Sequence, residues 1–245
     1  MAHGLASGHV CWQGKRYDFA DAPVYSEKNW GGQFPSRWFW LQCNTWEDTQ
    51  EDSSPPPAAN ATTATSATTT ATSDPTATAK IISLTCAGGR RGVPILGEED
   101  VAMIALHTDS DLGGASTGYF HPFPNVIWDM GPWGSWRAEG EFEGLRVLIE
   151  ARCDAAADPG ILVSVPTSEG MVDGSRETFE GKLRVQLWRG GDLLIDLHSS
   201  RAALELGGGP WDEPYVGACE VSELARSVLA ADPPLDRLRD RIPGY

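Results

Sequence analysis

The 245-residue chain has little positive charge, because 19 Lys and Arg are set against 34 Asp and Glu, for a formal net charge of −15. An acidic surface repels polyanions, and no cluster of basic residues interrupts it. We therefore exclude nucleic acid as a partner, together with adhesion to anionic lipid through a polybasic patch. The chain also lacks an apolar run near the ~20 residues that a membrane-spanning helix needs.

Paired cysteines and metal-binding motifs are missing as well. The five cysteines are odd in number, widely spaced and without a CxxC pair. This spacing argues against a disulfide framework and favours a reducing compartment. The five histidines are scattered singly, with no HxH or HExxH motif, so we predict no metal and no cofactor. No signal or transit peptide is recognisable, and we expect any targeting segment to lie outside this sequence.

Residues 47–79 have almost no apolar bulk and differ in composition from the rest of the chain. Acidic residues and a triple proline precede a tract made mostly of Thr and Ala. Such a segment cannot bury enough surface to offset its ordering entropy. We predict a disordered insertion in a hairpin loop. The sequon Asn60-Ala61-Thr62 and the many threonines leave a mucin-like stalk as the alternative.

Outside this insertion the sequence is typical of a β-sheet. Short apolar, aromatic and β-branched runs recur between Gly, Pro and Asp, and Leu183, Val185 and Leu187 alternate with polar neighbours. Tight connectors such as Gly190-Gly191-Asp192 favour hairpins over parallel crossovers. We predict strands at residues 9–13, 16–19, 37–46, 80–87, 101–108, 118–121, 126–130, 135–139, 145–152, 183–189, 193–198 and 202–206.

This many short strands with tight turns indicates an antiparallel barrel or sandwich. One helix is predicted near the C-terminus, where Val221, Leu224, Val228 and Leu229 share a face before Pro233-Pro234. The predicted organisation is therefore a β-barrel domain of residues 1–46 and 80–216. The disordered insertion 47–79 interrupts it, and a helical tail of residues 217–245 follows it.

The segment from Tyr25 to Trp40 concentrates aromatic side chains, charged groups and an Asn29-Trp30-Gly31-Gly32 turn. An aromatic turn that carries a carboxylate suits the lining of a pocket for a ring compound. An aromatic corner of the core explains the same residues equally well, and the composition alone does not separate the two.

Continued through Asn44, this segment resembles the signature stretch of the tocopherol cyclase family of plants, algae and cyanobacteria. Further matches follow in the same order, at Trp128–Trp136, Ile149–Arg152, Pro166–Gly170, Gly181–Trp188 and Ser199–Trp211. The chain departs from the family in two respects. It lacks the family's N-terminal half, and it carries the Thr/Ala tract.

The resemblance implies a lipocalin-like β-barrel, one of a pair that the family shares with carotenoid hydratases. Such a barrel can hold an apolar ligand in its mouth or interior. It further implies an isomerase, an intramolecular lyase that closes a phytyl-benzoquinol into a chromanol in tocopherol (vitamin E) biosynthesis. The implied location is the chloroplast, at plastoglobules or thylakoids, with peripheral contact to the lipid surface. The implied partners are the prenylated hydroquinone substrate and the missing N-terminal half.

Proton-initiated cyclisation needs a protonated carboxyl, aromatic faces beside a carbocation, and exclusion of water. Under the resemblance, the candidate catalytic acids are Glu27, in the aromatic turn, and Asp129, where aromatic neighbours would bury it. A surface ion pair of Glu27 with Lys28 or Arg37 is the alternative for that residue. The candidate substrate-binding residues are Asn29, Trp30, Trp38, Trp40, Trp133 and Trp136.

Two other functions remain open on the sequence. A carotenoid hydratase-like enzyme would use the same protonation and let water capture the cation. A non-catalytic, lipocalin-like carrier would bind the prenyl lipid without turnover. Analysis of the product separates a ring ether from a tertiary alcohol, and the absence of any product identifies a carrier.

Overall fold

The computed structural model describes residues 3–27, 34–47, 81–93, 97–109, 120–168 and 170–220. In this part of the chain all regular structure is β-strand, and no helix capable of crossing a membrane occurs there. The strands are β1 (Gly4–Trp12), β2 (Lys15–Val24), β3 (Arg37–Cys43), β4 (Ile81–Val93), β5 (Gly97–Thr108), β6 (Phe120–Phe123), β7 (Asn125–Met130), β8 (Ser135–Phe142), β9 (Leu145–Arg152), β10 (Ile161–Thr167), β11 (Gly170–Arg189), β12 (Asp192–Gly207) and β13 (Tyr215–Cys219).

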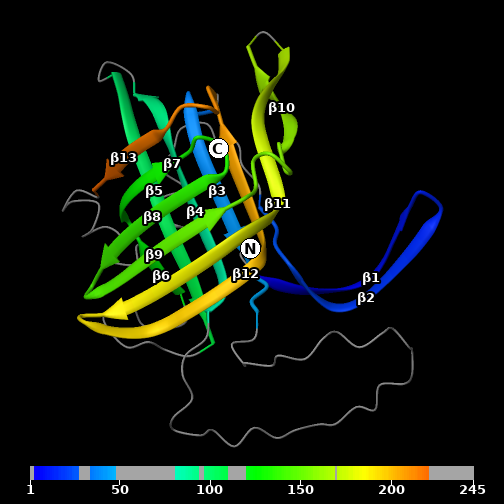
Figure 1. Ribbon diagram of the computed structural model, residues 1–245, viewed down its shortest axis with the longest axis horizontal. Helices are drawn as coiled ribbons and strands as arrows, with labels where there is room; N and C mark the ends of the chain where they lie inside the picture. Colours follow the sequence, from blue (N-terminus) through cyan, green and yellow to red (C-terminus); the bar gives the residue numbers. More distant parts are fainter. Residues whose placement is uncertain are drawn as a thin grey trace, which may run out of the picture.

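Eleven of these strands form one antiparallel sheet in the order β13-β7-β8-β9-β11-β12-β3-β4-β5-β6, with β10 paired to β11. The sheet curls into a nearly closed barrel, while β1 and β2 form a separate hairpin (Figure 1). The prediction of an antiparallel β-barrel is therefore confirmed. The predicted helix at residues 221–229 and nearly all of the predicted insertion lie outside the described residues.

Alternating side chains explain why this sequence closes around a core. On β9, Leu145, Val147, Ile149 and Ala151 are buried, and the residues between them are half-buried or exposed. Large aromatic rings fill part of the interior, where Phe39 packs on Trp128 with ring centroids 5.4 Å apart. The inside of the barrel around these rings is thus a packed core.

Side chains connect the two ends of the sheet where β13 approaches β5. The Tyr215 hydroxyl on β13 donates a 3.0 Å hydrogen bond to Asp100 on β5. Asp100 also pairs with Arg90 on β4 at 2.9 Å, and the guanidinium of Arg90 lies over the Tyr215 ring. The contacts of Tyr215 join β13 to β4 and β5, with which it shares no backbone ladder, so they help to hold the barrel shut.

Replacing Asp100 by asparagine is expected to destabilise the barrel at neutral pH by about 1–2 kcal/mol, because Arg90 and Tyr215 lose a charged acceptor. The hydrogen bond from Arg90 lowers the pKa of Asp100 in the folded protein. This stabilisation is therefore present above the pKa of an unfolded Asp, about 3.9, and is lost as the pH falls through the lower folded value. Urea unfolding at pH 7 and pH 3 should show the difference between wild type and Asp100→Asn shrinking in acid. A constant difference would contradict the assignment.

The sequence patterns missed two strands, β10 and β13, divided one long strand in two and predicted another too short. Residues 193–198 and 202–206, predicted as separate strands, belong to the single long strand β12. Its partner β11 continues past the predicted start at Leu183 back to Gly170, and the pairing shifts register around Gly181. The unpredicted β13 covers Tyr215–Cys219 and runs into the segment that we assigned to the helical tail.

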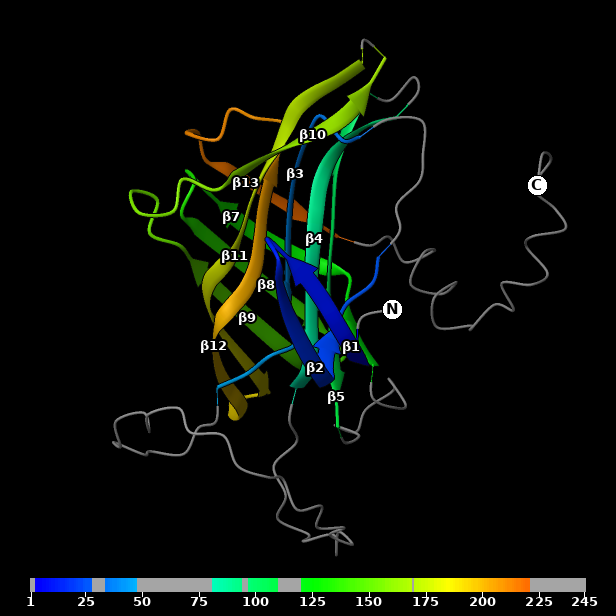
Figure 2. The same cartoon turned by 90° about the vertical axis from the view of Figure 1, so that its right-hand side faces the viewer.

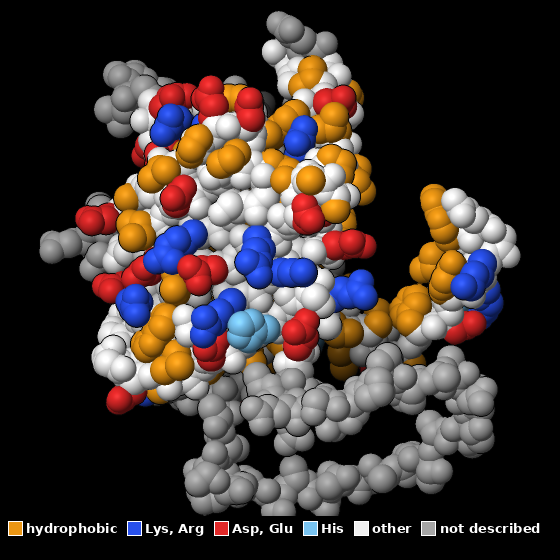
Figure 3. All heavy atoms as spheres, in the orientation of Figure 1, with side chains coloured by type: hydrophobic (Ala, Val, Ile, Leu, Met, Phe, Trp, Pro, Cys, Tyr) orange, Lys and Arg blue, Asp and Glu red, His pale blue; other side chains and the backbone are white. Residues whose placement is uncertain are grey.

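Two hairpin arms project from the barrel on the same side, β1–β2 and the outer part of β10–β11 (Figures 1 and 2). Both expose apolar side chains, which appear along the two arms in Figure 3. On β1–β2 these are Leu5, Val10, Trp12, Tyr17 and Phe19, and on β10–β11 they are Ile161, Leu162, Met171, Val172 and Phe179. Exposed apolar patches of this kind mark interaction surfaces.

Candidate functional site

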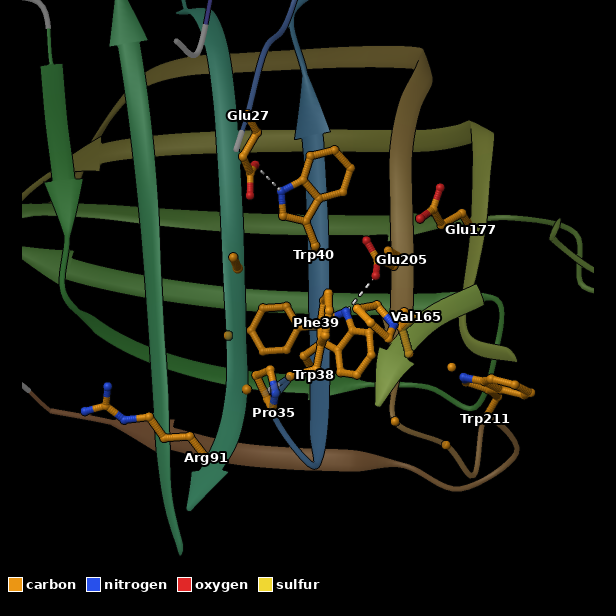
Figure 4. Close-up of a pocket in the computed structure, with 18 of the residues that line it drawn as sticks. Glu27, Pro35, Trp38, Phe39, Trp40, Arg91, Val165, Glu177, Glu205 and Trp211 are labelled. Carbon is orange, nitrogen blue, oxygen red and sulfur yellow. Dashed lines mark hydrogen bonds between the residues drawn. The ribbon is translucent and has the colours of Figure 1, made fainter. Parts of the chain in front are cut away.

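An open groove of about 1600 Å³ lies on the outer side of the wall made by β3, β4, β5, β11 and β12, and residues of β10 line it as well. We call it the outer groove. Its aromatic lining comes mainly from Trp38 and Trp40 on β3 and from Trp211, and its carboxylates include Glu27, Glu177 and Glu205. Figure 4 shows Glu27, Trp38 and Trp40 over β3 and β4, and Glu177, Glu205 and Trp211 on the side of β11 and β12.

Strand alternation places the two β3 tryptophans in the outer groove. Phe39 and Leu41 are almost fully buried in the barrel core, so Trp38 and Trp40, which alternate with them, point to the opposite face. The Trp38 ring packs on Phe34 with centroids 5.3 Å apart, and the Trp40 ring packs on Tyr25 at 5.7 Å. Both rings are half-buried, which leaves part of each face open to a ligand.

Gly207 on β12 makes room for Trp38, because a Cβ atom at this position would overlap the indole ring. The two residues are direct neighbours in the β12–β3 ladder. Glycine is required here for a close approach between the neighbouring backbone and the ring. The orientation of Trp38 therefore depends on the absence of a side chain on the adjacent strand.

We expect Gly207→Ala to push the Trp38 ring out of place and to lower the free energy of unfolding by about 1–3 kcal/mol. Binding of an apolar ring compound to the outer groove should weaken as well, by roughly tenfold, because the ring that forms its wall has moved. Gly191→Ala is the matched control, since nothing lies within 4 Å of a Cβ atom at that position. Equal effects of the two substitutions on ligand binding would argue against this role for Gly207.

Glu27, our first candidate for the acid, lies at the edge of the outer groove just after β2. Its carboxylate accepts a 3.2 Å hydrogen bond from the Trp40 indole and another from the Tyr25 hydroxyl. Burial, followed by the contact with Glu27, raises the pKa of Tyr25, so this phenol stays protonated as a donor. Arg37, the alternative partner considered for Glu27, donates to the carbonyl groups of Pro210 and Glu213.

Glu177 and Glu205 form a second carboxylate group in the outer groove, on the other side of Trp40 in Figure 4. They are directly paired across the β11–β12 ladder, so their side chains share one face. Glu205 accepts hydrogen bonds from the Trp38 indole at 2.6 Å and the Ser175 hydroxyl at 2.8 Å. Burial is the largest cause that raises the pKa of Glu177, and the neighbouring charge of Glu205 is the second. A hydrogen bond with Ser175 acts in the opposite direction and lowers this pKa.

The other predicted residues are not gathered in the outer groove. Trp133 and Trp136 belong to the buried core, with 7% and 1% of their surfaces exposed and ring centroids 5.1 Å apart. Asp129 is exposed on β7, a strand that does not line the groove, so the aromatic burial on which its choice rested is not found. Asn29 and Trp30 lie outside the described residues.

Sequence reasoning missed Glu177, Glu205 and Trp211 as groove residues. Glu205 and Trp211 lie within a segment that carries the family resemblance, but no local pattern marks either one as functional. Glu177 and Glu205 are 28 positions apart in the sequence, and their pairing depends on the register between β11 and β12. That register shifts twice between Thr178 and Leu183. No group of three or more potential metal ligands occurs among the described residues.

Comparison with known proteins identifies the family of the chain. The family model described as "Tocopherol cyclase-like" matches residues 1–65 and 71–208. A chloroplastic tocopherol cyclase of Zea mays is 35% identical over 241 residues, covering 94% of this chain and 42% of the relative. A probable chloroplastic tocopherol cyclase of Oryza sativa subsp. japonica is 33% identical over 251 residues, covering 97% of this chain and 45% of the relative.

No solved structure matches the chain at a significant level. The chain spans less than half the length of these curated relatives. The family model nevertheless covers most of the barrel, including β3 and β12, whose side chains form the wall of the outer groove. The chain therefore belongs to the tocopherol cyclase-like family.

Proposed function

We propose that this chain forms part of a tocopherol cyclase, and that the outer groove is where a prenylated hydroquinone is closed into a chromanol. The observation that carries the proposal is one open groove in which tryptophan rings and carboxylates face the same space, on a chain of this family. Aromatic faces stabilise a passing carbocation, each by about 0.5–2 kcal/mol, and a carboxyl group can supply the initiating proton.

The groove wall suits both ends of such a substrate. Trp38 and Trp40 offer flat apolar faces to the ring and to the first part of the prenyl tail. Glu27 lies beside Trp40 as a hydrogen-bond acceptor, and we propose that it acts as a catalytic carboxylate at a hydroxyl of the hydroquinone. We expect the more distant, apolar part of the tail to lie along exposed side chains such as Met103 and Phe179, which also line the groove.

We further propose that a second barrel, for which the greater length of the relatives leaves room, covers the outer groove. The groove is open, whereas carbocation chemistry requires that water be kept out. The two arms on this side of the barrel expose large apolar side chains such as Trp12 and Met171, at 66% and 65% exposed. A covering domain seated between the arms would bury these side chains and close the site.

The names of both relatives place them in the chloroplast, and we propose the same location for this protein. Its substrate would be a neutral, water-insoluble lipid, so we propose peripheral contact with plastoglobules or thylakoid membranes. The exposed apolar residues of the arms supply a contact that does not depend on positive charge.

The test is to incubate the chain with a phytyl-benzoquinol, alone and together with the N-terminal remainder of the maize relative, and to identify the products. We expect chromanol formation, at least tenfold faster when both parts are present, because the second part excludes water from the groove. Full speed from the chain alone would show that the site lies within one barrel. A tertiary alcohol would indicate a hydratase, and tight binding without turnover would indicate a carrier.

A further inference from the structure

We propose that Glu177 is the proton donor of the outer groove and that Glu205 is the charged partner that keeps the proton on Glu177. This inference rests on the proposed cyclase function and names the acid for it. The two residues are opposite each other in the β11–β12 ladder, and both line the groove. They come from strands that the barrel holds side by side, so their separation is fixed by the sheet.

Two hydrogen-bond donors reach the carboxyl group of Glu205, which suits its proposed role as the charged partner. The Trp38 indole N–H can only donate, and its 2.6 Å bond to Oε1 requires Glu205 to accept. The Ser175 hydroxyl makes a second bond of 2.8 Å to the same oxygen. One oxygen of Glu205 thus accepts two hydrogen bonds, as a carboxylate oxygen can.

Two features favour a proton on Glu177. A hydrogen bond with Ser175 lowers the pKa of Glu177, but a serine hydroxyl has a single hydrogen, which Ser175 gives to Glu205 here. Burial of Glu177 and the adjacent charge of Glu205 raise its pKa, as expected when two carboxylates share a site.

Among the residues that the structure describes, no basic group near Glu177 lines the groove to oppose this effect. The charged side chains of this part of the chain that line the outer groove are Glu27, Arg91, Asp173, Glu177 and Glu205. Strand β10, paired to β11, carries no charged residue between Ile161 and Thr167. The adjacent Arg176 places its guanidinium over the Trp211 ring, 4.8 Å from the centroid.

The groove beside these carboxylates also has a polar group that a ligand would satisfy. The indole nitrogen of Trp211 is buried and has no hydrogen-bond partner within the part of the chain that the structure describes. Trp211 lines the same groove as Glu177 and Glu205. A buried donor without a partner costs about 1–3 kcal/mol, and a substrate oxygen would relieve this cost.

The proposed reaction balances without a further reagent. The O–H bond of Glu177 breaks as its proton adds to the less substituted alkene carbon of the prenyl tail, and the alkene electrons leave a tertiary carbocation. A lone pair of the phenolic oxygen then forms the C–O bond. The phenolic proton passes to the ionised Glu177 and restores the acid. Substrate and product are isomers, so no electrons are gained or lost.

The first experiment measures cyclisation by the chain paired with the N-terminal remainder of the maize relative. Glu177→Gln should slow turnover by roughly 10²–10⁴-fold with little change in substrate binding, because it removes the proton and keeps the shape. Glu141→Gln, on the exposed face of β8 and outside the groove, is the control and should have no effect. If the wild type is active and Glu177→Gln keeps the same rate, the role of Glu177 is overturned and the proposed function stands. If the wild type is inactive, the proposed function itself is overturned.

The second experiment separates a positioning role of Glu205 from a structural one. When Glu205→Gln removes the charge of Glu205, Glu177 should lose its proton at a lower pH. The Glu205→Gln protein should therefore react more slowly than wild type mainly near neutral pH, and its rate should return toward that of wild type in acid. An equal loss at every pH would contradict that role. Carboxyl carbon NMR of the chain tests the pair independently of turnover. Glu177 should titrate above an ordinary glutamate and move down in Glu205→Gln, whereas ordinary titration in both proteins would overturn the proposal.

Discussion

Replacing Trp136 by alanine is expected to lower the free energy of unfolding by about 3–5 kcal/mol and the melting temperature by roughly 10 °C. Only 1% of this side chain is exposed, and its ring packs edge-on against Trp133. Its indole N–H also donates a 3.2 Å hydrogen bond to the carbonyl oxygen of Glu205, which joins β8 to β12 across the barrel. Removing the ring leaves a cavity and takes one hydrogen bond from the carbonyl group of Glu205.

This substitution also separates two interpretations of Trp136. We predicted it from the sequence as a substrate-binding residue, and the structure places it in the core. A core residue should affect stability, measured by thermal and urea unfolding, far more than it affects ligand affinity in the folded fraction. Trp12→Ala is the control, because Trp12 is 66% exposed on the β1–β2 arm and its loss should leave stability nearly unchanged. Similar melting temperatures for Trp136→Ala and wild type would refute the core assignment.

Replacing Trp38 by alanine should have the opposite profile, with a small loss of stability and a large loss of ligand affinity. The ring is half-buried and forms the wall of the outer groove above Gly207. Deleting it removes aromatic contact worth about 2–3 kcal/mol, which corresponds to a dissociation constant raised roughly 30- to 150-fold. It also removes one of the two donors that hold the Glu205 carboxylate.

A phenylalanine at the same position distinguishes the two contributions of Trp38. Trp38→Phe keeps most of the aromatic face but loses the indole N–H, so binding should fall by only a few-fold. Turnover should fall further than binding, because Glu205 is less well held beside Glu177. The measurement is displacement of a fluorescent prenylated quinol analogue, together with chromanol formation. If Trp38→Ala binds the analogue as tightly as wild type, the outer groove is not the ligand site.

The sequence patterns were most informative where a strand is short, alternating and bounded by turns. The predictions for residues 126–130 and 145–152 match β7 and β9, because each strand has one buried and one exposed face. They failed along β11 and β12, which continue as single strands of 20 and 16 residues. Ser199-Ser200-Arg201 has the composition of a turn, yet the ladder to β11 carries the chain through it.

The candidate site was only partly predictable for a related physical reason. Trp38, Trp40 and Glu27 were found because they lie close together in the sequence, and the structure keeps them in one groove. Trp133 and Trp136 occur in an equally aromatic segment, but the barrel turns both rings inward. A local cluster of tryptophans shows that large rings are needed nearby. It does not show which face of the sheet they occupy.

The sequence by itself determined the all-β class, the family and the aromatic segment around β3, since these depend on alternation, turn residues and motif order along the chain. Only the tertiary structure decided which face of each strand meets the core and which meets the outer groove. It also brought Glu177 on β11 opposite Glu205 on β12. Two carboxylates influence each other only when they are close in space, however far apart they lie in the sequence. The distance between these two is set by the strand register, which depends on the bulges and on the closure of the barrel.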